Sequence, residues 1–324
     1  MSFKIIITKD FNQMSEEAAK IMIEDIKKFQ ASKQEKENYV LGLATGNTPT
    51  GAYKILAKAA NDGEFDPTSI VTFNLDEYVG LPGKRIPDRV LHPESYAYFM
   101  IQELFGLMKK KFKKTYVPYG TEIEQEKLIS ELEKYKDNPD VYELLGTDKG
   151  RQILIKPNGP SEYLNWIKKE LLDGYLEEIK KYGGINLHIV GVGGRGHVAF
   201  HESGIPFDQE MLLVKLDENT IENAVIDGHF KSKEDSPQYA TSMGAAAVYK
   251  AETVLLVANG KRKTSPIAES LLGPVTPDVP ISYSQKYAEE GGNMIYVIDE
   301  IAAGGILDKL DKLKDKGYEI EDKR

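Results

Sequence analysis

The sequence predicts an α/β fold: a doubly wound, mostly parallel Rossmann-like sheet with helices on both faces. Two observations support this prediction. Apolar runs typical of buried strands alternate with amphipathic segments along most of the 324 residues, as in parallel sheets built from βαβ units. Glycine-containing turns directly follow several of these runs, as they do where strands end at a ligand-binding edge. We expect a single domain spanning residues 1–324.

The expected elements follow in chain order. Residues 4–8 predict the first strand, and residues 12–29 predict a helix because apolar side chains recur on one face. The other expected strands are residues 39–44, 70–73, 187–192, 211–216, 253–258 and 294–298, and the other expected helices are residues 50–60, 95–105, 161–182, 264–272 and 300–314.

Two segments interrupt this alternation. Residues 83–92 are polar and contain a proline, which predicts either a surface loop or a mobile lid beside a site. Residues 137–160 are rich in Asp, Asn, Gly and Pro, and we expect a surface insertion there.

Composition excludes several classes of function. The formal net charge of −9 argues against nucleic-acid binding driven by overall electrostatics. The absence of cysteine excludes thiol catalysis, disulfides and cysteine-ligated metals. No apolar run has the length of a membrane span, and the N-terminus has no signal-peptide core. We therefore expect a cytoplasmic protein that does not bind membranes.

The second expected strand leads into Leu43-Ala-Thr-Gly-Asn-Thr-Pro-Thr-Gly51. A strand, a Gly/Thr turn and a helix start present free backbone N–H groups and the positive end of the helix dipole to an anion. This predicts a phosphate site that includes Gly46, Asn47 and Thr48. The alternative is an ordinary strand-to-helix connection. A nucleotide-binding P-loop is excluded because the Gly-Lys-Ser/Thr ending is missing.

The third expected strand ends in Phe73-Asn-Leu-Asp-Glu-Tyr78. A carboxylate at that edge, partly removed from water, can remove a C–H proton next to a carbonyl. Asp76 or Glu77 is the candidate base. The alternative is an aspartate that caps the next turn.

The stretch Gly191-Val-Gly-Gly-Arg-Gly-His-Val-Ala-Phe-His-Glu202 follows the apolar run 187–190. His197 is a natural general acid/base, because the unperturbed pKa of histidine lies near neutrality. Glu202 can orient its ring, as a carboxylate does in a catalytic triad. The alternative is a His and a Glu that only satisfy loop backbone groups. No serine lies in a nucleophile-elbow pattern, so acyl-enzyme chemistry is not supported.

A further strand ends in Asn259-Gly-Lys-Arg-Lys263. A lysine here can complete a phosphate site as a mobile point charge, although a solvated basic turn is an equal alternative from this segment alone. Taken together, Thr48, Asp76, the His197/Glu202 pair and Lys263 predict one phosphate pocket beside one acid/base pair. No histidine-rich metal site can be assembled from the sequence.

Five short motifs lie at these positions: Ala44-Thr-Gly-Asn-Thr-Pro49, Phe73-Asn-Leu-Asp-Glu-Tyr78, His92-Pro-Glu-Ser-Tyr96, Gly193-Gly-Arg-Gly-His-Val-Ala-Phe200 and Gly260-Lys-Arg-Lys263. Their order and spacing, over residues 1–105 and 160–300, resemble the glucosamine-6-phosphate deaminase (isomerase) family. The related 6-phosphogluconolactonases have Asp-Glu-Arg where this chain has Asp76, Glu77 and Tyr78.

The resemblance implies an aldose–ketose isomerisation coupled to deamination, in which an amino-sugar phosphate and water give a ketose phosphate and ammonia. It implies no metal and no organic cofactor. By this analogy Asp76 moves the proton between C1 and C2, and His197, held by Glu202, assists ring opening. Thr48 and Lys263 bind the phosphate. The expected ligand is a small-molecule sugar phosphate, and we expect a homo-oligomer.

This chain departs from the family pattern near the site. Arg195 replaces a carboxylate two residues before the histidine, and its cation could pair with Asp76 or Glu202 or bind the substrate. Val225 stands close to where the family has a phosphate-binding arginine. Arg195, Arg85 or Arg89 are candidates to compensate, and the family's Asn before the Glu is His201 here. These changes keep open a lactonase-like enzyme and a non-catalytic sugar-phosphate-binding protein.

Overall fold

The computed structural model describes residues 2–32 and 37–324. Its main sheet has the strand order β13-β1-β12-β11-β8-β2-β3-β5, and all its strand pairs are parallel. This confirms the predicted fold class. The strands are β1 (Ser2–Thr8), β2 (Tyr39–Leu43), β3 (Ile70–Asn74), β5 (Lys114–Tyr116), β8 (Leu187–Val190), β11 (Thr253–Ala258), β12 (Asn293–Asp299) and β13 (Glu319–Asp322).

Helices cover both faces of this sheet because its buried side chains alternate between two hydrophobic clusters. In β1, Ile6 faces the cluster formed with the first helices, whereas Ile5 and Ile7 face the other cluster. The first face carries α1 (Phe11–Ala31), α2 (Thr50–Asn61) and α4 (Tyr96–Glu103), and the second carries α7 (Gly174–Lys181), α10 (Thr264–Leu272), α11 (Tyr283–Glu289) and α12 (Glu300–Ala303).

Two expected helices differ from the prediction. Residues 161–182 form one helical stretch, α6 (Glu162–Trp166) followed by α7, but a π-helical segment at residues 167–173 joins them. Residues 300–314 do not form one helix, because Gly304 and Gly305 follow α12 and glycine disfavours helix interiors. A Cβ on Gly305 would lie 2.8 Å from the Ala268 Cβ of α10. The chain turns there and continues as α13 (Leu310–Asp315).

A second sheet, which the sequence analysis missed, has the order β4-β10-β9-β7-β6 and is antiparallel. Residues 211–216 form a strand as expected, but it belongs to this sheet. One hydrophobic cluster contains residues of both sheets. That residues 1–324 form a single domain stays a prediction. The strands are β4 (Asp76–Val79), β6 (Tyr142–Gly146), β7 (Arg151–Ile155), β9 (Met211–Lys215) and β10 (Tyr239–Met243).

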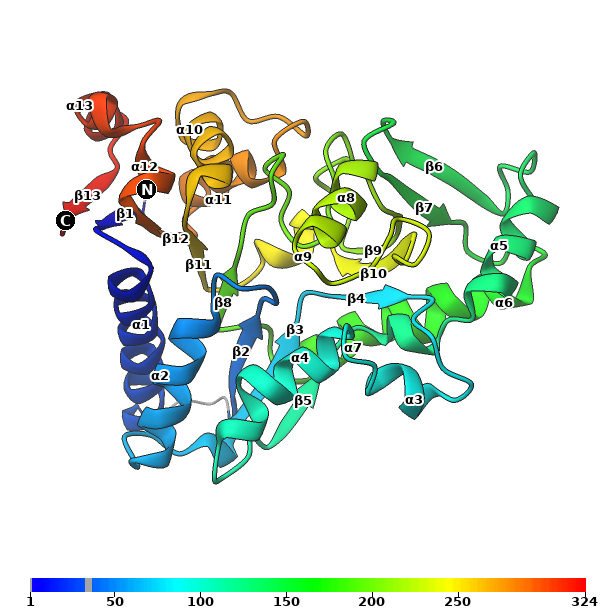
Figure 1. Ribbon diagram of the computed structural model, residues 1–324, viewed down its shortest axis with the longest axis horizontal. Coiled ribbons are helices and arrows are strands. Elements are labelled where there is room, and N and C mark those ends of the chain that lie inside the picture. Colours follow the sequence, from blue (N-terminus) through cyan, green and yellow to red (C-terminus); the bar gives the residue numbers. More distant parts are fainter. Residues whose placement is uncertain (1, 33–36) are drawn as a thin grey trace.

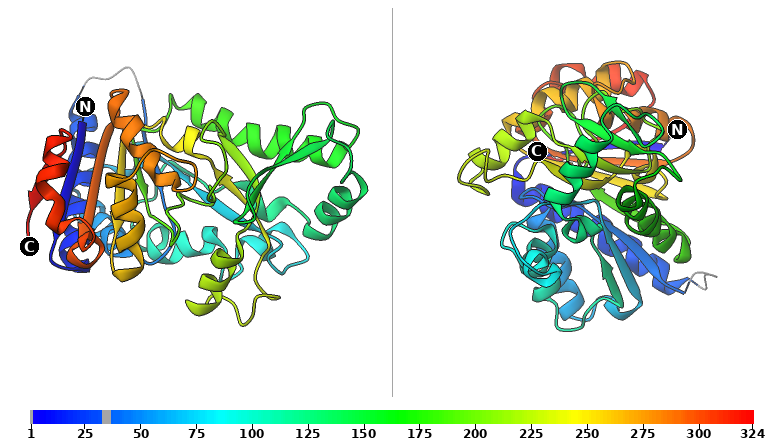
Figure 2. Two further views of the ribbon diagram at one scale, coloured as in Figure 1. Left: turned by 90° about the horizontal axis from the view of Figure 1, so that it is seen from above. Right: turned by 90° about the vertical axis from the view of Figure 1, so that its right-hand side faces the viewer.

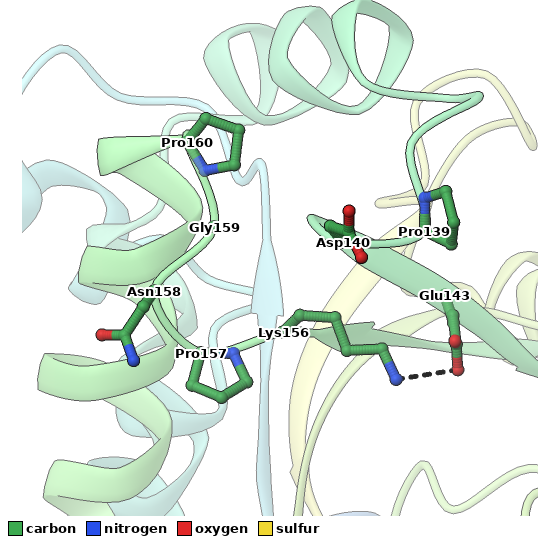
Figure 3. A pocket seen from close by; sticks show the side chains of 8 residues that line it. All are labelled: Pro139, Asp140, Glu143, Lys156, Pro157, Asn158, Gly159 and Pro160. Carbon is green, nitrogen blue, oxygen red and sulfur yellow. Dashed lines mark ion pairs between the residues drawn. The ribbon is translucent and has the colours of Figure 1, made fainter.

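The segment 137–160 contains the hairpin β6–β7. Together with α5 (Gln125–Lys134) and α6, it lies at the end of the molecule opposite the two termini (Figures 1 and 2). Its surface holds a cavity of about 500 Å³ beside the ion pair between Lys156 Nζ and Glu143 Oε2, 2.9 Å apart (Figure 3). The rest of the cavity is lined by Pro139, Asp140, Pro157, Asn158, Gly159 and Pro160.

The segment 83–92 is not entirely a loop, because it contains the short helix α3 (Ile86–Val90). Its buried Arg89 donates from Nε to the carbonyl of Thr121 at 2.6 Å. Movement of this segment as a lid stays a prediction. Within residues 2–32 and 37–324, no helix combines the length and the apolar character needed to cross a bilayer.

Candidate active site

A cavity of about 590 Å³ lies beyond the carboxyl ends of β2, β3, β8 and β11. In the sheet, β8 and β2 are neighbours; β8 pairs on its other side with β11, and β2 pairs on its other side with β3. Open α/β sheets bind ligands at such a topological switch point. We call it the active-site cavity. Among the residues predicted from sequence, those that line it are Gly46, Asn47, Thr48, Asp76, His197 and Lys263.

The turn between β2 and α2 forms one end of the cavity. Gly46 has φ +96°, a conformation that glycine adopts without a steric penalty. Thr48 Oγ1 donates a hydrogen bond to Asn259 Oδ1 at 2.8 Å, which ties this turn to the turn after β11. Because α2 begins at Thr50, directly after Pro49, its positive end lies beside this turn, as an anion site requires.

Asp76 lies where the chain passes from one sheet to the other. It is the first residue of β4, two positions after the end of β3, and its side chain is almost completely buried. Thr45 Oγ1 is 3.5 Å from Asp76 Oδ1. Burial, together with the neighbouring charge of Glu77, raises the pKa of Asp76 well above its ordinary value. A carboxylate with a raised pKa is a stronger base once ionised.

The carboxylate of Glu77 is bound to the first residues of α4 and does not line the cavity. Its Oε1 accepts from the backbone N–H groups of Tyr78 at 2.9 Å and Tyr96 at 3.0 Å, and its Oε2 accepts from that of Ala97 at 3.0 Å. Burial has a larger effect than these hydrogen bonds, which lower the pKa, and it raises the pKa of Glu77 to about 7. Of the two candidate bases, Asp76 therefore faces the cavity and Glu77 fixes α4 against β4.

The raised pKa of Glu77 predicts a pH-dependent stability. The folded state binds this proton more tightly than the unfolded chain, whose pKa is 4.5. This tighter proton binding contributes up to about 3 kcal/mol to the free energy of unfolding. The contribution is fully present below pH 4.5 and is lost as the pH rises through about 7. In Glu77→Gln, urea unfolding between pH 4 and 8 should show a shallower fall of stability with pH. The exposed Glu290→Gln serves as the control, and curves parallel to wild type for both variants would contradict the assignment.

His197 and Glu202 form the predicted pair. His197 Nδ1 is 2.8 Å from Glu202 Oε2, and the other carboxylate oxygen accepts from Thr220 Oγ1 at 2.8 Å and from the backbone N–H of Asp217 at 3.3 Å. A carboxylate only accepts, so the ring proton is assigned to Nδ1, which leaves Nε2 for a substrate. The ring packs against Gly193, where a Cβ would lie 1.3 Å from His197 Nε2.

Arg195 does not line the active-site cavity. Its Nε is 3.0 Å from Oδ2 of Asp217, a buried residue that caps the N-terminus of α8 (Glu218–Ile226), so it pairs with neither Asp76 nor Glu202. Arg85 pairs with Asp88, and Arg89 binds backbone carbonyls of its own segment and of Thr121. Neither arginine lines the cavity in this structure, and a contribution of Arg85 or Arg89 to the phosphate site stays a prediction.

Lys263 is fixed at the start of α10. Its Nζ donates to the carbonyl of Val192, two positions after the end of β8, at 2.5 Å. Burial and the neighbouring Arg262 guanidinium lower the pKa of Lys263. An arriving phosphate dianion would favour the charged ammonium, which is consistent with the phosphate role predicted for this lysine.

Two parts of the cavity wall were not predicted from the sequence. Tyr78, Tyr96 and Phe200 form an aromatic wall, in which the Tyr96 and Phe200 rings stack with centroids 5.9 Å apart. Helix α8 supplies Thr220 and Asn223, and Asp227, which caps the C-terminus of this helix, also lines the cavity. Asp217 as N-cap, followed by apolar residues at 221, 224 and 225, was the available signal for this helix. Val225 itself packs against the cluster that includes Tyr78 and Phe200.

His201, which replaces the family's Asn, is buried outside the cavity and has a structural role. Its Nδ1 accepts from the backbone N–H of Ala245 at 2.9 Å, so its Nε2 donates to the carbonyl of Ile205 at 3.0 Å. Burial lowers the pKa of His201 to about 4. Among the described residues, no three or more His, Asp or Glu side chains gather in a way that could hold a metal ion.

Comparison with known proteins gives a consistent picture. The chain is 35% identical to the glucosamine-6-phosphate deaminase of Thermoanaerobacter pseudethanolicus over 94% of its own length and 96% of that protein. It is 31% identical to the glucosamine-6-phosphate deaminase of Clostridioides difficile, over 98% and 99% of the two chains. No model of a known protein family matches the chain.

Solved structures share the fold. A monomeric glucosamine-6-phosphate deaminase superposes with a TM-score of 0.68 and 24% identity, covering 93% of this chain and 99% of that one. The 6-phosphogluconolactonase of Trypanosoma cruzi superposes with a TM-score of 0.57 and 17% identity, covering 95% and 98% of the two chains. At these identities the likeness shows the fold alone.

Proposed function

Because this chain belongs to the glucosamine-6-phosphate deaminase family, we propose that it converts an amino-sugar 6-phosphate, glucosamine 6-phosphate or a close relative, to a ketose 6-phosphate and ammonia. One observation carries the proposal. The buried carboxylate of Asp76 and the His197–Glu202 pair line or adjoin the same cavity as the turn at Thr48 and the ammonium of Lys263. The cavity thus joins an acid/base pair to an anion site.

The geometry supports a role for each group. Nε2 of His197 can take the proton of the C1 hydroxyl and pass it to the ring oxygen as the C1–O5 bond breaks, while Glu202 holds the imidazole through Nδ1. Asp76 then takes the proton from C2 and returns it to C1, and a second proton moves from the amino nitrogen to the C1 oxygen, which together convert the amino aldose to a ketose imine. Water adds to C2 of the imine and ammonia leaves, so the overall reaction consumes one water molecule. All these steps are proton transfers and additions that side chains catalyse.

A matched acid and base at a phosphate site favour an enzyme over a protein that only binds a sugar phosphate. The lactonase-like alternative has no comparable support, because those structural neighbours share the fold alone. The sequence Asp76-Glu77-Tyr78 also differs from the Asp-Glu-Arg pattern expected of that family. The charge of a sugar phosphate keeps it from crossing membranes, which supports the expected cytoplasmic location. The expected homo-oligomer stays a prediction, testable by light scattering.

The decisive measurement is ammonia release on incubation with glucosamine 6-phosphate, with galactosamine 6-phosphate in parallel. Ammonia from one of the two establishes the reaction and identifies the epimer. Unphosphorylated glucosamine is the matched control, and it should react far more slowly because it cannot use the anion site. A folded protein that releases ammonia from neither phosphate would contradict the proposal.

A further inference from the structure

The anion end of the active-site cavity contains an arginine with no role so far. Lys261, Arg262 and Lys263 form the turn after β11, and all three line the cavity. Arg262 is the one arginine among its lining residues in the described part of the chain. The turn is anchored, because the backbone N–H of Gly260 donates to both carboxylate oxygens of Asp299, each at 3.1 Å. Arg262 therefore extends from a fixed backbone.

The guanidinium of Arg262 is paired across the cavity with Asp227. Its Nη2 is 2.9 Å from Asp227 Oδ1 and 3.2 Å from Oδ2, and both residues line the cavity. Asp227 caps the C-terminus of α8, which is an unfavourable position for a negative charge because the helix dipole is negative there. The pair is also partly exposed, since 59% of the Arg262 side chain is accessible, and exposed ion pairs contribute little. Asp227 is therefore a weak partner for Arg262.

A phosphate dianion bound between Thr48 and Lys263 would be a stronger partner. It carries more charge than a carboxylate and offers oxygens that match the guanidinium fork. Asp227, in contrast, is partly exposed and returns to water at low cost when released. We propose that Arg262 is a phosphate-binding residue of this site, and that Asp227 is the counterion that holds its guanidinium in place until the substrate arrives. This inference rests on the proposed function, because it assigns a residue to the phosphate of that substrate.

The assignment also agrees with the positions of the other arginines. Arg195 is paired with Asp217, and Arg89 binds backbone carbonyls outside the cavity. Val225, on the same helix as Asp227, packs against the cluster that includes Tyr78. The C-terminus of α8 thus places the carboxylate of Asp227 at the anion end of the cavity, and the turn after β11 provides the guanidinium of Arg262.

The test compares two variants that break the same ion pair. Arg262→Ala should weaken the binding of inorganic phosphate and of glucosamine 6-phosphate at least about tenfold in calorimetry, because it removes a charged hydrogen-bond donor. Asp227→Asn should leave that binding unchanged or tighten it, because it removes a competitor for the guanidinium. Binding of unphosphorylated glucosamine should be unaffected by Arg262→Ala. Arg262→Lys, which keeps the charge and loses the fork, should fall between Ala and wild type.

An ion pair that is only structural predicts a different result, in which both variants weaken phosphate binding together. That result, or unchanged phosphate binding in Arg262→Ala, would overturn the assignment. Arg324→Ala controls for the loss of a positive charge, since Arg324 pairs with Asp322 and Glu300 beside the outermost strand of the main sheet. Because these are binding measurements, they test Arg262 even if the wild type binds phosphate and releases no ammonia, which would contradict only the proposed function.

Discussion

Asp76→Asn should reduce ammonia release about 10³-fold or more while sugar-phosphate binding stays nearly unchanged. Asparagine keeps the shape of the side chain and its neighbour Thr45 Oγ1, but it cannot accept a proton from carbon, and general-base catalysis typically contributes about 10²- to 10⁴-fold. The measurement is kcat under saturating substrate, together with calorimetric binding of the sugar phosphate to the inactive variant. Asp62→Asn, at the exposed C-terminus of α2, controls for the substitution itself.

The dependence of kcat/KM on pH is a second test of Asp76 as the base. Because burial raises the pKa of Asp76, the ionised base accumulates only as the pH rises, and kcat/KM should increase over that range. A variant that loses binding and folding together would show that Asp76 is structural. Unaltered turnover in a folded variant would remove it from the mechanism altogether.

Gly193→Ala should lower kcat about 10²-fold or more, a loss of the size expected for a misplaced catalytic group. The added methyl would lie 1.3 Å from His197 Nε2, so the imidazole must leave its position and its bond to Glu202. The nitrogen affected is the one that faces the substrate. Turnover and the histidine NMR resonances measure the two consequences.

The matched variant for ring position is Gly191→Ala, in the same turn, where an added Cβ meets no atom within 4 Å. It should leave the His197 resonances at their wild-type positions, whereas Gly193→Ala should shift them. If Gly193→Ala keeps both turnover and resonances, the ring does not depend on this close approach. If both variants shift the ring equally, the turn as a whole is responsible.

The strongly periodic parts of the fold could be predicted from the sequence. The run at residues 254–258, for example, is apolar throughout and is followed by a glycine turn, so both the strand and its ligand-binding edge can be predicted. The second sheet could not be predicted in the same way. Its strands β4 and β10 are short and contain polar residues such as Asp76, Glu77 and Thr241, which are buried here by partners distant in sequence.

Part of the candidate site could likewise be predicted from the sequence, and part could not. Asp76, His197 and Lys263 each follow a strand, and strand polarity alone brings them to one edge. The partner of Arg195 could not be predicted in this way, because a local pattern can indicate that Asp217 caps a helix but not which side chain it meets. Arg195 and Asp217 are 22 positions apart, and their pairing depends on how the segments that carry them pack together. Only the tertiary structure determines that.

The bond between Thr48 and Asn259 joins residues 211 positions apart. The anion end of the cavity therefore does not exist until the N-terminal and C-terminal parts of the main sheet have paired, and such non-local pairing is slow to form. Phosphate is then a ligand of the completely folded chain and not of partly folded ones. Its binding should protect the whole molecule from unfolding and proteolysis, by an amount that grows with the logarithm of its concentration.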